Sequence, residues 1–181
     1  MENVVQATLS RIDDEDRATR AFRASRLQEL ADARMPKRLY PRDAAATWEA
    51  SFAFQDALSS YVNGTFIGSI LAAQACLEHM LGDHMRSSHG ESLKGATMRS
   101  LLTKARRADL ITEDEYKVFD RLSRRRNAYT HYRLSPDAGR LAERALESGQ
   151  SMMHVIAEDA RQAMLSLAGI CGRPPFAELP A

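Results

Sequence analysis

The sequence predicts an all-α protein, folded as an antiparallel bundle of five to seven helices. Apolar residues recur at spacings of three and four along most of the 181-residue chain, and no stretch alternates as a strand would. Hydrophobic residues make up 44% and charged residues 27%, which is the composition of a globular protein. Short connections between the helical stretches favour antiparallel neighbours.

The chain is long enough for one domain with its own core. We expect three segments. An N-terminal helix and connector occupy residues 1–42, a helical bundle occupies residues 43–171, and a loose C-terminal tail occupies residues 172–181.

Proline and glycine place the ends of the first two helices. The first is expected over about Asp14–Arg34, because Pro36 follows it. Asp43 is a candidate cap for a second helix that runs to about Val62. Asn63-Gly64 ends that helix, because glycine tolerates the left-handed conformation of a helix terminus.

The middle of the chain predicts two further helices. Thr65 is expected to cap a helix over about Phe66–Met85, and Ser87–Glu91 is expected to be a polar loop. The next helix is expected over about Leu93–Arg107.

The last third of the chain carries the clearest start and stop signals. Thr112–Glu115 is a capping box that opens a helix through about Arg133. Ser135-Pro136 is a second start signal, with proline at the first helical position, and Gly149 interrupts the helix that follows. A final helix is expected over about Gln150–Ile170.

Several function classes lack their signatures in this chain. No apolar run reaches the ~18 residues that a membrane helix needs, and Met1–Asp16 is acidic, unlike a signal peptide, so we expect a cytoplasmic protein. Cys76 and Cys171 lie far apart and match no ligand spacing. The remaining candidate metal ligands are His79, Asp83, His84 and His89. They do not converge at metal-binding spacing, so no metal and no cofactor is expected.

Positive charge is concentrated in one stretch. Arg99–Arg133 holds ten Lys/Arg against five Asp/Glu, a net charge of +5, whereas the rest of the chain carries −4. A local positive field favours a phosphate-bearing partner, although most charged runs are only solvated helix faces.

The most informative residues lie at the end of this stretch. On a helical wheel of about 100° per residue, one stripe holds Phe119, Leu122, Arg126, Tyr129 and Arg133. Asn127 and His131 are four residues apart and stack on one side, with Thr130 between them and Arg126. Burying Arg126 costs free energy unless it has a partner or faces a water-filled cleft.

The run Arg126-Asn127-Ala128-Tyr129-Thr130-His131 resembles the Arg-polar-x3-His signature of the HEPN superfamily of nucleotide-binding helical domains. Its setting is also similar, because an Ala-rich helix containing Glu78 precedes it. The resemblance covers roughly Asp43–Ile170. It implies a HEPN-like bundle that forms a homodimer, so that two copies of the motif share one cleft.

Many HEPN proteins are metal-independent endoribonucleases, and others are non-catalytic. The resemblance implies an endoribonuclease that cleaves RNA by 2′-hydroxyl attack, of the kind that serves as a toxin or defence effector with a cognate inhibitor protein. The alternative is a non-catalytic HEPN-like module that binds a nucleotide, RNA or another protein.

The residues of the motif suit this chemistry. RNA carries its own nucleophile, so the protein must move protons and stabilise charge at the phosphate. His131 has an ordinary pKa near ~6.5 and can serve as acid and base. Arg126 offers a planar fork that matches two phosphate oxygens, and Asn127 can orient the imidazole or bind the phosphate.

Neighbouring residues are candidates for substrate binding and support. The substrate-binding candidates are Arg124, Arg125, Tyr129, Thr130 and Arg133. Glu78 follows Ile67 and Leu71 along one stripe, so we expect it to contact Arg126 or another arginine of the motif, the alternative being a surface glutamate.

A purely structural interpretation stays open. Asn127 and His131 can form an ordinary side-chain pair at a helix end, and Arg126 can neutralise Glu78 or Asp120. That interpretation predicts an Arg126 ion pair closed off from solvent.

Overall fold

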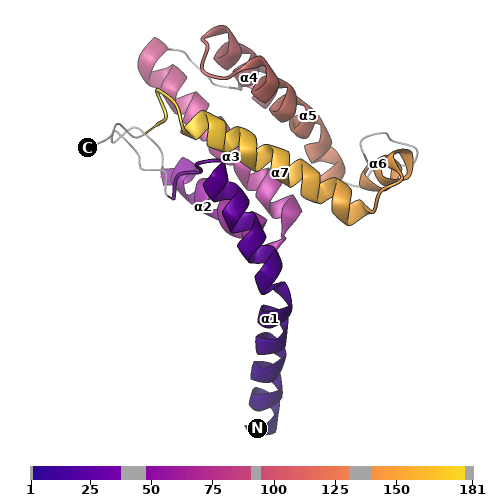
Figure 1. Ribbon diagram of the computed structural model, residues 1–181. Helices are drawn as coiled ribbons and strands as arrows, with labels where there is room; N and C mark the ends of the chain where they lie inside the picture. The colour runs from indigo at the N-terminus through magenta and orange to yellow at the C-terminus, as the bar shows by residue number, and fades with distance from the viewer. Residues whose placement is uncertain (1, 38–47, 91–94, 131–139, 178–181) are drawn as a thin grey trace.

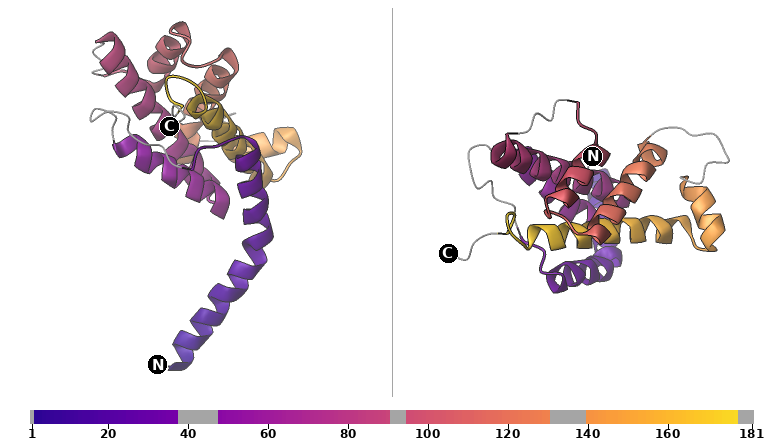
Figure 2. Two further views of the ribbon diagram at one scale, coloured as in Figure 1. Left: turned by 60° about the vertical axis from the view of Figure 1, so that its left-hand side comes forward. Right: turned by 90° about the horizontal axis from the view of Figure 1, so that it is seen from above.

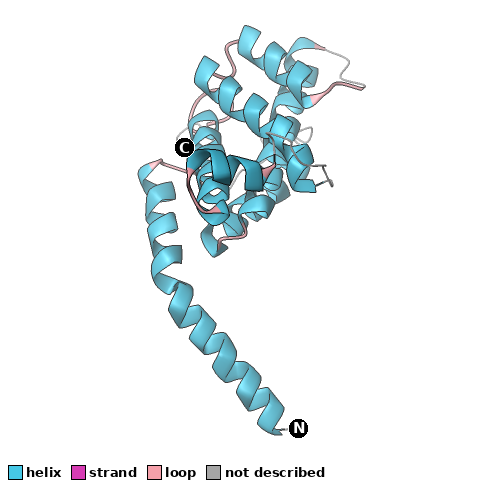
Figure 3. Ribbon diagram, turned by 90° about the vertical axis from the view of Figure 1, so that its right-hand side faces the viewer, coloured by secondary structure: helices cyan, strands magenta, loops and turns pink. Residues whose placement is uncertain are grey.

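The computed structural model describes residues 2–37, 48–90, 95–130 and 140–177, and this part of the chain contains seven helices and no strand (Figures 1 and 3). The helices are α1 (Glu2–Asp32), α2 (Trp48–Asn63), α3 (Phe66–His89), α4 (Met98–Arg107), α5 (Glu113–Thr130), α6 (Leu141–Ser148) and α7 (Met152–Cys171). The expected all-α bundle is thus confirmed. No helix among the described residues is long and apolar enough to cross a membrane.

The core lies between α3 and α7, with the remaining helices packed around this pair (Figure 1). The largest fully buried side chains include Leu77 and Leu81 of α3, Leu167 of α7 and Phe119 of α5. Such residues recur every three or four positions, so each helix turns one apolar face inward. Burial of this surface supplies most of the favourable free energy of folding.

Both cysteines belong to this core. Cys76 and Cys171 are free and buried. Burial raises the pKa of the Cys171 thiol to about 12, because the thiolate would be desolvated. The two thiols therefore pack as small apolar groups.

The first helix is longer than expected. It begins at Glu2 rather than near Asp14, because no proline or glycine precedes Pro36. Its N-terminal half extends away from the body of the molecule (Figure 2). Its other half docks through Leu30, which is buried, and through Glu29, which accepts hydrogen bonds from Tyr61 and Arg161.

The turn between α2 and α3 follows the expected glycine signal. Gly64 has φ +80°, a left-handed conformation that L side chains rarely adopt. The Arg26 guanidinium of α1 donates to the Val62 carbonyl at 2.9 Å and lies over the Phe66 ring. Thr65 occupies the N-cap position of α3, but its hydroxyl makes no capping hydrogen bond.

Two helix boundaries differ from the expectation. A loop was expected at Ser87–Glu91, but the α3 helix continues through His89. Polar residues can extend a helix as long as no helix breaker intervenes, and here Gly90 (φ +62°) caps the end. The α4 helix begins at Met98, where Thr97 caps the Ser100 N–H. The expected starts at Asp43, Leu93 and Ser135 lie outside the described residues.

The start of α5 confirms the capping box. The Glu115 carboxylate accepts from the Thr112 N–H at 2.8 Å, and the Thr112 hydroxyl accepts from the Glu115 N–H at 3.2 Å. Arg173 donates to Glu115 and to the Leu110 carbonyl. The chain just after α7 is therefore anchored at Arg173, where a loose tail was expected, because Glu115 is a buried acid that requires a cationic partner.

The two threonine caps provide a test of this helix chemistry. Replacing Thr97 with Ala should lower the free energy of unfolding by about 1 kcal/mol, because the Ser100 N–H loses its partner. Thr65→Ala is the matched control. Both threonines are exposed, and Thr65 makes no capping bond, so the same change should cost less than half as much. Urea unfolding followed by circular dichroism measures both values, and equal losses would contradict the cap assignment.

Candidate functional site

The motif lies at the C-terminal end of α5. Arg126 and Thr130 are exposed in the last two turns, and the Thr130 hydroxyl donates back to the Arg126 carbonyl at 2.9 Å. Asn127 belongs to the same helix, but its side chain lies outside the described residues, as do His131 and Arg133. The motif side chains that the structure describes are therefore those of Arg126, Tyr129 and Thr130.

Three consecutive arginines at this end have different environments. Arg124 pairs with Asp120 of the same helix and stays 68% exposed. Arg125 turns inward and donates to Asp159 of α7 at 2.6 Å. Arg126 is exposed and makes no ion pair with a described residue. Of the three, it is the guanidinium left for an external anion.

A buried carboxylate on α7 collects charged groups from three helices. Asp159 Oδ1 accepts from Arg125, while Oδ2 accepts from the Tyr129 hydroxyl and pairs with Arg144 Nη1 of α6 at 2.8 Å. Arg144 Nη1 also donates to the Tyr129 hydroxyl at 2.7 Å. Both carboxylate oxygens thus have charged or hydroxyl donors, which is what a buried carboxylate requires.

The Asp159 cluster carries more positive than negative charge. The side chains of Arg125 and Arg144 are only 24% and 11% exposed, and they share one carboxylate that is 5% exposed. Burial lowers the pKa of Arg125, and the neighbouring charges of Arg144 and Arg121 act in the same direction. Burial opposes the charge of Arg144 as well, but the hydrogen bond and charge of Asp159 raise its pKa overall.

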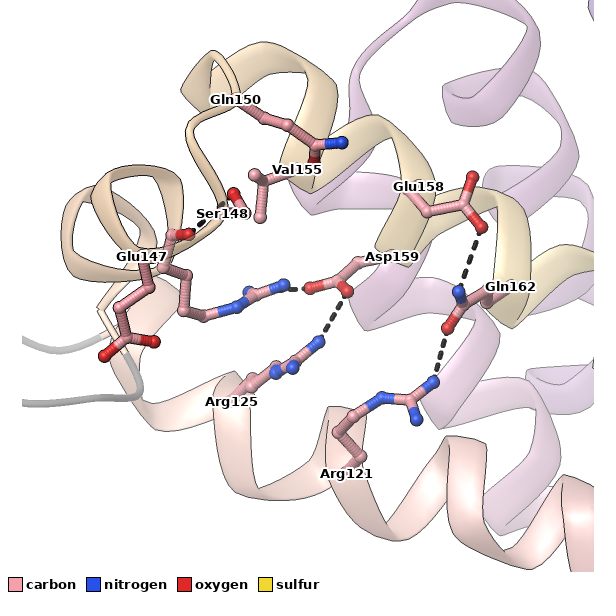
Figure 4. A pocket seen from close by; sticks show the side chains of 10 residues that line it. Arg121, Arg125, Glu147, Ser148, Gln150, Val155, Glu158, Asp159 and Gln162 are labelled. Atoms are coloured by element: carbon pink, nitrogen blue, oxygen red, sulfur yellow. Dashed lines mark hydrogen bonds and ion pairs between the residues drawn. The ribbon is translucent and has the colours of Figure 1, made fainter.

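An open pocket of about 430 Å³ lies beside this cluster, between α5, α6 and α7 (Figure 4). Arg121 and Arg125, one helical turn apart on α5, reach toward α7 from one wall (Figure 4). Arg121 donates to the amide oxygen of Gln162, whose nitrogen donates to Glu158 at 2.9 Å. Arg121 is therefore held by a neutral partner rather than by a carboxylate.

The inward stripe of α5 differs from the expectation near its end. Phe119 and Leu122 are fully buried, as expected, but the stripe continues through Arg125 and the half-buried Tyr129 rather than through Arg126. The reason is tertiary. Beyond Leu122 the neighbour of α5 is α7. Asp159 of α7 accepts hydrogen bonds from Arg125 and Tyr129, so the side of α5 that carries these two residues faces inward.

Neither of the two predicted partners of Arg126, Glu78 and Asp120, forms an ion pair with it. Glu78 is exposed on α3 and makes no ion pair with Arg126 or with another described arginine; Arg133, the last arginine of the motif region, lies outside the described residues. Asp120 is buried and pairs with Arg124 and with Arg99 at 3.6 Å. The closed Arg126 pair that a purely structural interpretation predicts is not found among the described residues.

Of the α3 histidines, His79 and His84 have described side chains, and neither forms a cluster with other described metal ligands. His79 is exposed, and the His84 ring packs against Phe176 with ring centroids 5.7 Å apart. Asp83 pairs with Arg86 at 3.3 Å. Within the described ranges, no group of three or more His, Cys, Asp or Glu side chains is placed to hold a metal ion.

The importance of Asp159 could have been recognised from the sequence of α7, although the helical wheel of α5 alone does not show it. Asp159 interrupts the apolar face of α7 formed by Val155, Ile156, Ala160 and Ala163. An acid on such a face requires a buried partner, by the same physical rule that singled out Arg126. Which arginine would reach it depended on the packing of α5 and α6 against α7.

Comparisons with models of protein families, with curated proteins and with solved structures find no match to this chain. The residues of the site and their chemistry are therefore the basis of the functional assignment.

The Tyr129–Asp159 hydrogen bond should appear in the pH dependence of stability. Burial and then the Asp159 hydrogen bond raise the pKa of Tyr129 from 10.0 to about 12. A raised pKa stabilises the fold fully below the ordinary value, and this contribution is lost as the pH rises from about 10 to about 12. Tyr129→Phe should lower stability by about 2 kcal/mol at neutral pH and flatten the loss above pH ~10.

Urea unfolding at a series of pH values measures this difference. Tyr61 also has a raised pKa, mainly through burial and the Glu29 hydrogen bond, but it is present in both proteins. The difference between the two profiles therefore isolates Tyr129. Parallel profiles above pH ~10 would show that Tyr129 ionises as freely in the folded as in the unfolded chain.

Proposed function

We propose that this chain is a HEPN-like, metal-independent endoribonuclease that cleaves RNA by attack of its own 2′-hydroxyl. The observation that supports this most is the state of Arg126. Its two preceding neighbours are paired with carboxylates, whereas Arg126 is exposed and makes no ion pair with a described residue, next to the rest of an Arg-polar-x3-His motif.

In this reaction the protein stabilises charge and transfers protons. The 2′-oxygen forms a bond to phosphorus as the bond from phosphorus to the 5′-oxygen breaks. His131 transfers protons, taking one from the 2′-hydroxyl or giving one to the leaving 5′-oxygen. Arg126 binds the non-bridging oxygens, on which negative charge grows, and Asn127 orients the imidazole or the phosphate.

The charge around the motif supports a polyanionic substrate. Arg124 is largely exposed despite its pair with Asp120, and Arg107 is exposed at the end of α4. Exposed arginines of this kind bind the phosphate backbone without reading its sequence, and their contribution falls as salt rises. Arg125 and Tyr129, by contrast, are bound to Asp159, so we assign them to the support of α5 rather than to RNA.

A second copy of the chain completes the proposal. Each chain has one His131 in its motif, while the reaction needs both a base and an acid. A homodimer with two motifs in one cleft would supply both groups. A nuclease of this kind also requires control, for which a cognate inhibitor protein is the partner we propose.

Cleavage of a fluorescent RNA by the purified protein tests the assignment. His131→Ala should lower the rate ~10²- to 10⁴-fold, and Arg126→Ala ~10²- to 10³-fold, because each removes transition-state stabilisation. Arg17→Ala is the matched control. Arg17 is an exposed arginine on α1, and its loss should leave the rate within about twofold.

Binding measured separately by fluorescence anisotropy distinguishes the alternatives. Cleavage retained by His131→Ala would exclude the catalytic assignment. RNA binding by a wild-type protein that does not cleave would identify the non-catalytic module instead. Absence of both activities would refute an RNA-directed function.

A further inference from the structure

The described side chains in the last two turns of α5 make few attachments to the rest of the molecule. Leu122 is the last fully buried residue described in this helix. Beyond it, Arg124, Arg126 and Thr130 are exposed. Among the described side chains, the hydrogen bonds that join this end of α5 to α7 come from Arg125 and Tyr129, and both lead to Asp159.

We propose that Asp159 is a positioning residue, which fixes the end of α5 and thereby the direction of Arg126. This inference rests on the proposed function, since the end of α5 is the part that acts on RNA. Asp159 itself is buried, with both oxygens occupied by Arg125, Tyr129 and Arg144, so it acts through other groups rather than on the substrate.

The geometry of the Asp159 contacts suits this role. Arg125 and Tyr129 are four residues apart and bind different oxygens of one carboxylate. Two attachments one turn apart prevent the helix end from rotating about its axis or unwinding. Arg126 follows Arg125 at about 100° around the helix, so fixing residues 125 and 129 also fixes where residue 126 points.

Arg144 adds a third attachment from the other direction along the chain. It lies on α6, which follows residues 131–139, whereas Tyr129 precedes them. The Arg144 guanidinium binds both Asp159 and the Tyr129 hydroxyl. The helices on both sides of that stretch are therefore tied to the same carboxylate.

The opposite end of α5 provides a matched control. Glu115 is also a buried acid, and it pairs with Arg173 and caps the Thr112 N–H. Replacing Glu115 should destabilise the protein as a lost buried ion pair does, but it lies about three turns away from Arg126 along the helix. Loss of stability and loss of positioning can thus be separated.

The experiment compares Asp159→Asn with Glu115→Gln in steady-state RNA cleavage, well below the unfolding temperature of each variant. Asp159→Asn should lower kcat ~10- to 100-fold with little change in KM. The Arg126 guanidinium would move by only a small distance, which weakens catalysis much more than it weakens RNA binding. Glu115→Gln should keep kcat within about twofold. Adding Tyr129→Phe to Asp159→Asn should cause no further loss, because both changes act on the same attachment.

Amide hydrogen exchange of residues 124–130 provides a readout that does not depend on cleavage. Exchange should speed up in Asp159→Asn and in Tyr129→Phe, but not in Glu115→Gln. Tyr129→Phe keeps both ion pairs and serves if Asp159→Asn does not fold; its kcat should fall to less than half of the wild-type value.

The outcomes separate this inference from the proposed function. If His131→Ala is inactive but a folded Asp159→Asn cleaves like wild type, Asp159 has no positioning role and the nuclease assignment stands. If Glu115→Gln loses as much kcat as Asp159→Asn, the effect is one of general stability and the inference is wrong. If the wild type does not cleave RNA, the proposed function fails. In that case, unchanged hydrogen exchange of residues 124–130 in Asp159→Asn would show that Asp159 does not fix the end of α5, and the inference would be wrong as well.

Discussion

One buried carboxylate joins three helices at the C-terminal end of α5. Asp159 receives Arg125 and Tyr129 from α5 and Arg144 from α6. Burying a carboxylate and two guanidiniums costs several kcal/mol of desolvation for each ion, which the mutual attraction and the hydrogen bonds must offset. A cluster of this kind is weak evidence for stability, but it strongly constrains how the three helices meet. Arg126, the next residue along α5, is left on the outside.

The α5 helix is thus held by acids at both of its ends. Glu115 joins its first turn to Arg173, just beyond α7, while Asp159 joins its last turns to the first half of α7. Between these points Phe119 and Leu122 pack into the core. The helix therefore lies along α7 as a braced element. Its C-terminal end carries the exposed Arg126, while Arg121 and Arg125 of the same helix line the open pocket against α7 (Figure 4).

Local chemistry allowed much of the fold to be predicted from the sequence. The Thr112–Glu115 capping box and the stops at Gly64 and Gly149 depend on a few neighbouring residues, and the structure has them where expected. The long α1 was missed at its start because an acidic cluster at residues 13–16 resembles a first turn, while the residues before it are also compatible with a helix.

The candidate site was harder to predict, because it depends on which helices become neighbours. A wheel shows that Arg125 and Arg126 lie about 100° apart, but not which of them meets an acid on another helix. Glu78 was expected to meet Arg126 because it continues an apolar stripe, yet it lies where α3 faces solvent. Asp159 was identifiable as an acid on an apolar face, but its three partners come from α5 and α6, far away in sequence.

The central claim is that the end of α5 promotes RNA cleavage by attack of the 2′-hydroxyl of the RNA. The chemical structure of the product ends tests this claim most directly. Mass spectrometry of products formed in the presence of a metal chelator should find 2′,3′-cyclic phosphate on one fragment and a 5′-hydroxyl on the other. An RNA with a single 2′-deoxynucleotide should resist cleavage at that position only. Fragments ending in a 3′-hydroxyl, or cleavage at the deoxy position, would contradict the account, because neither can arise from 2′-hydroxyl attack.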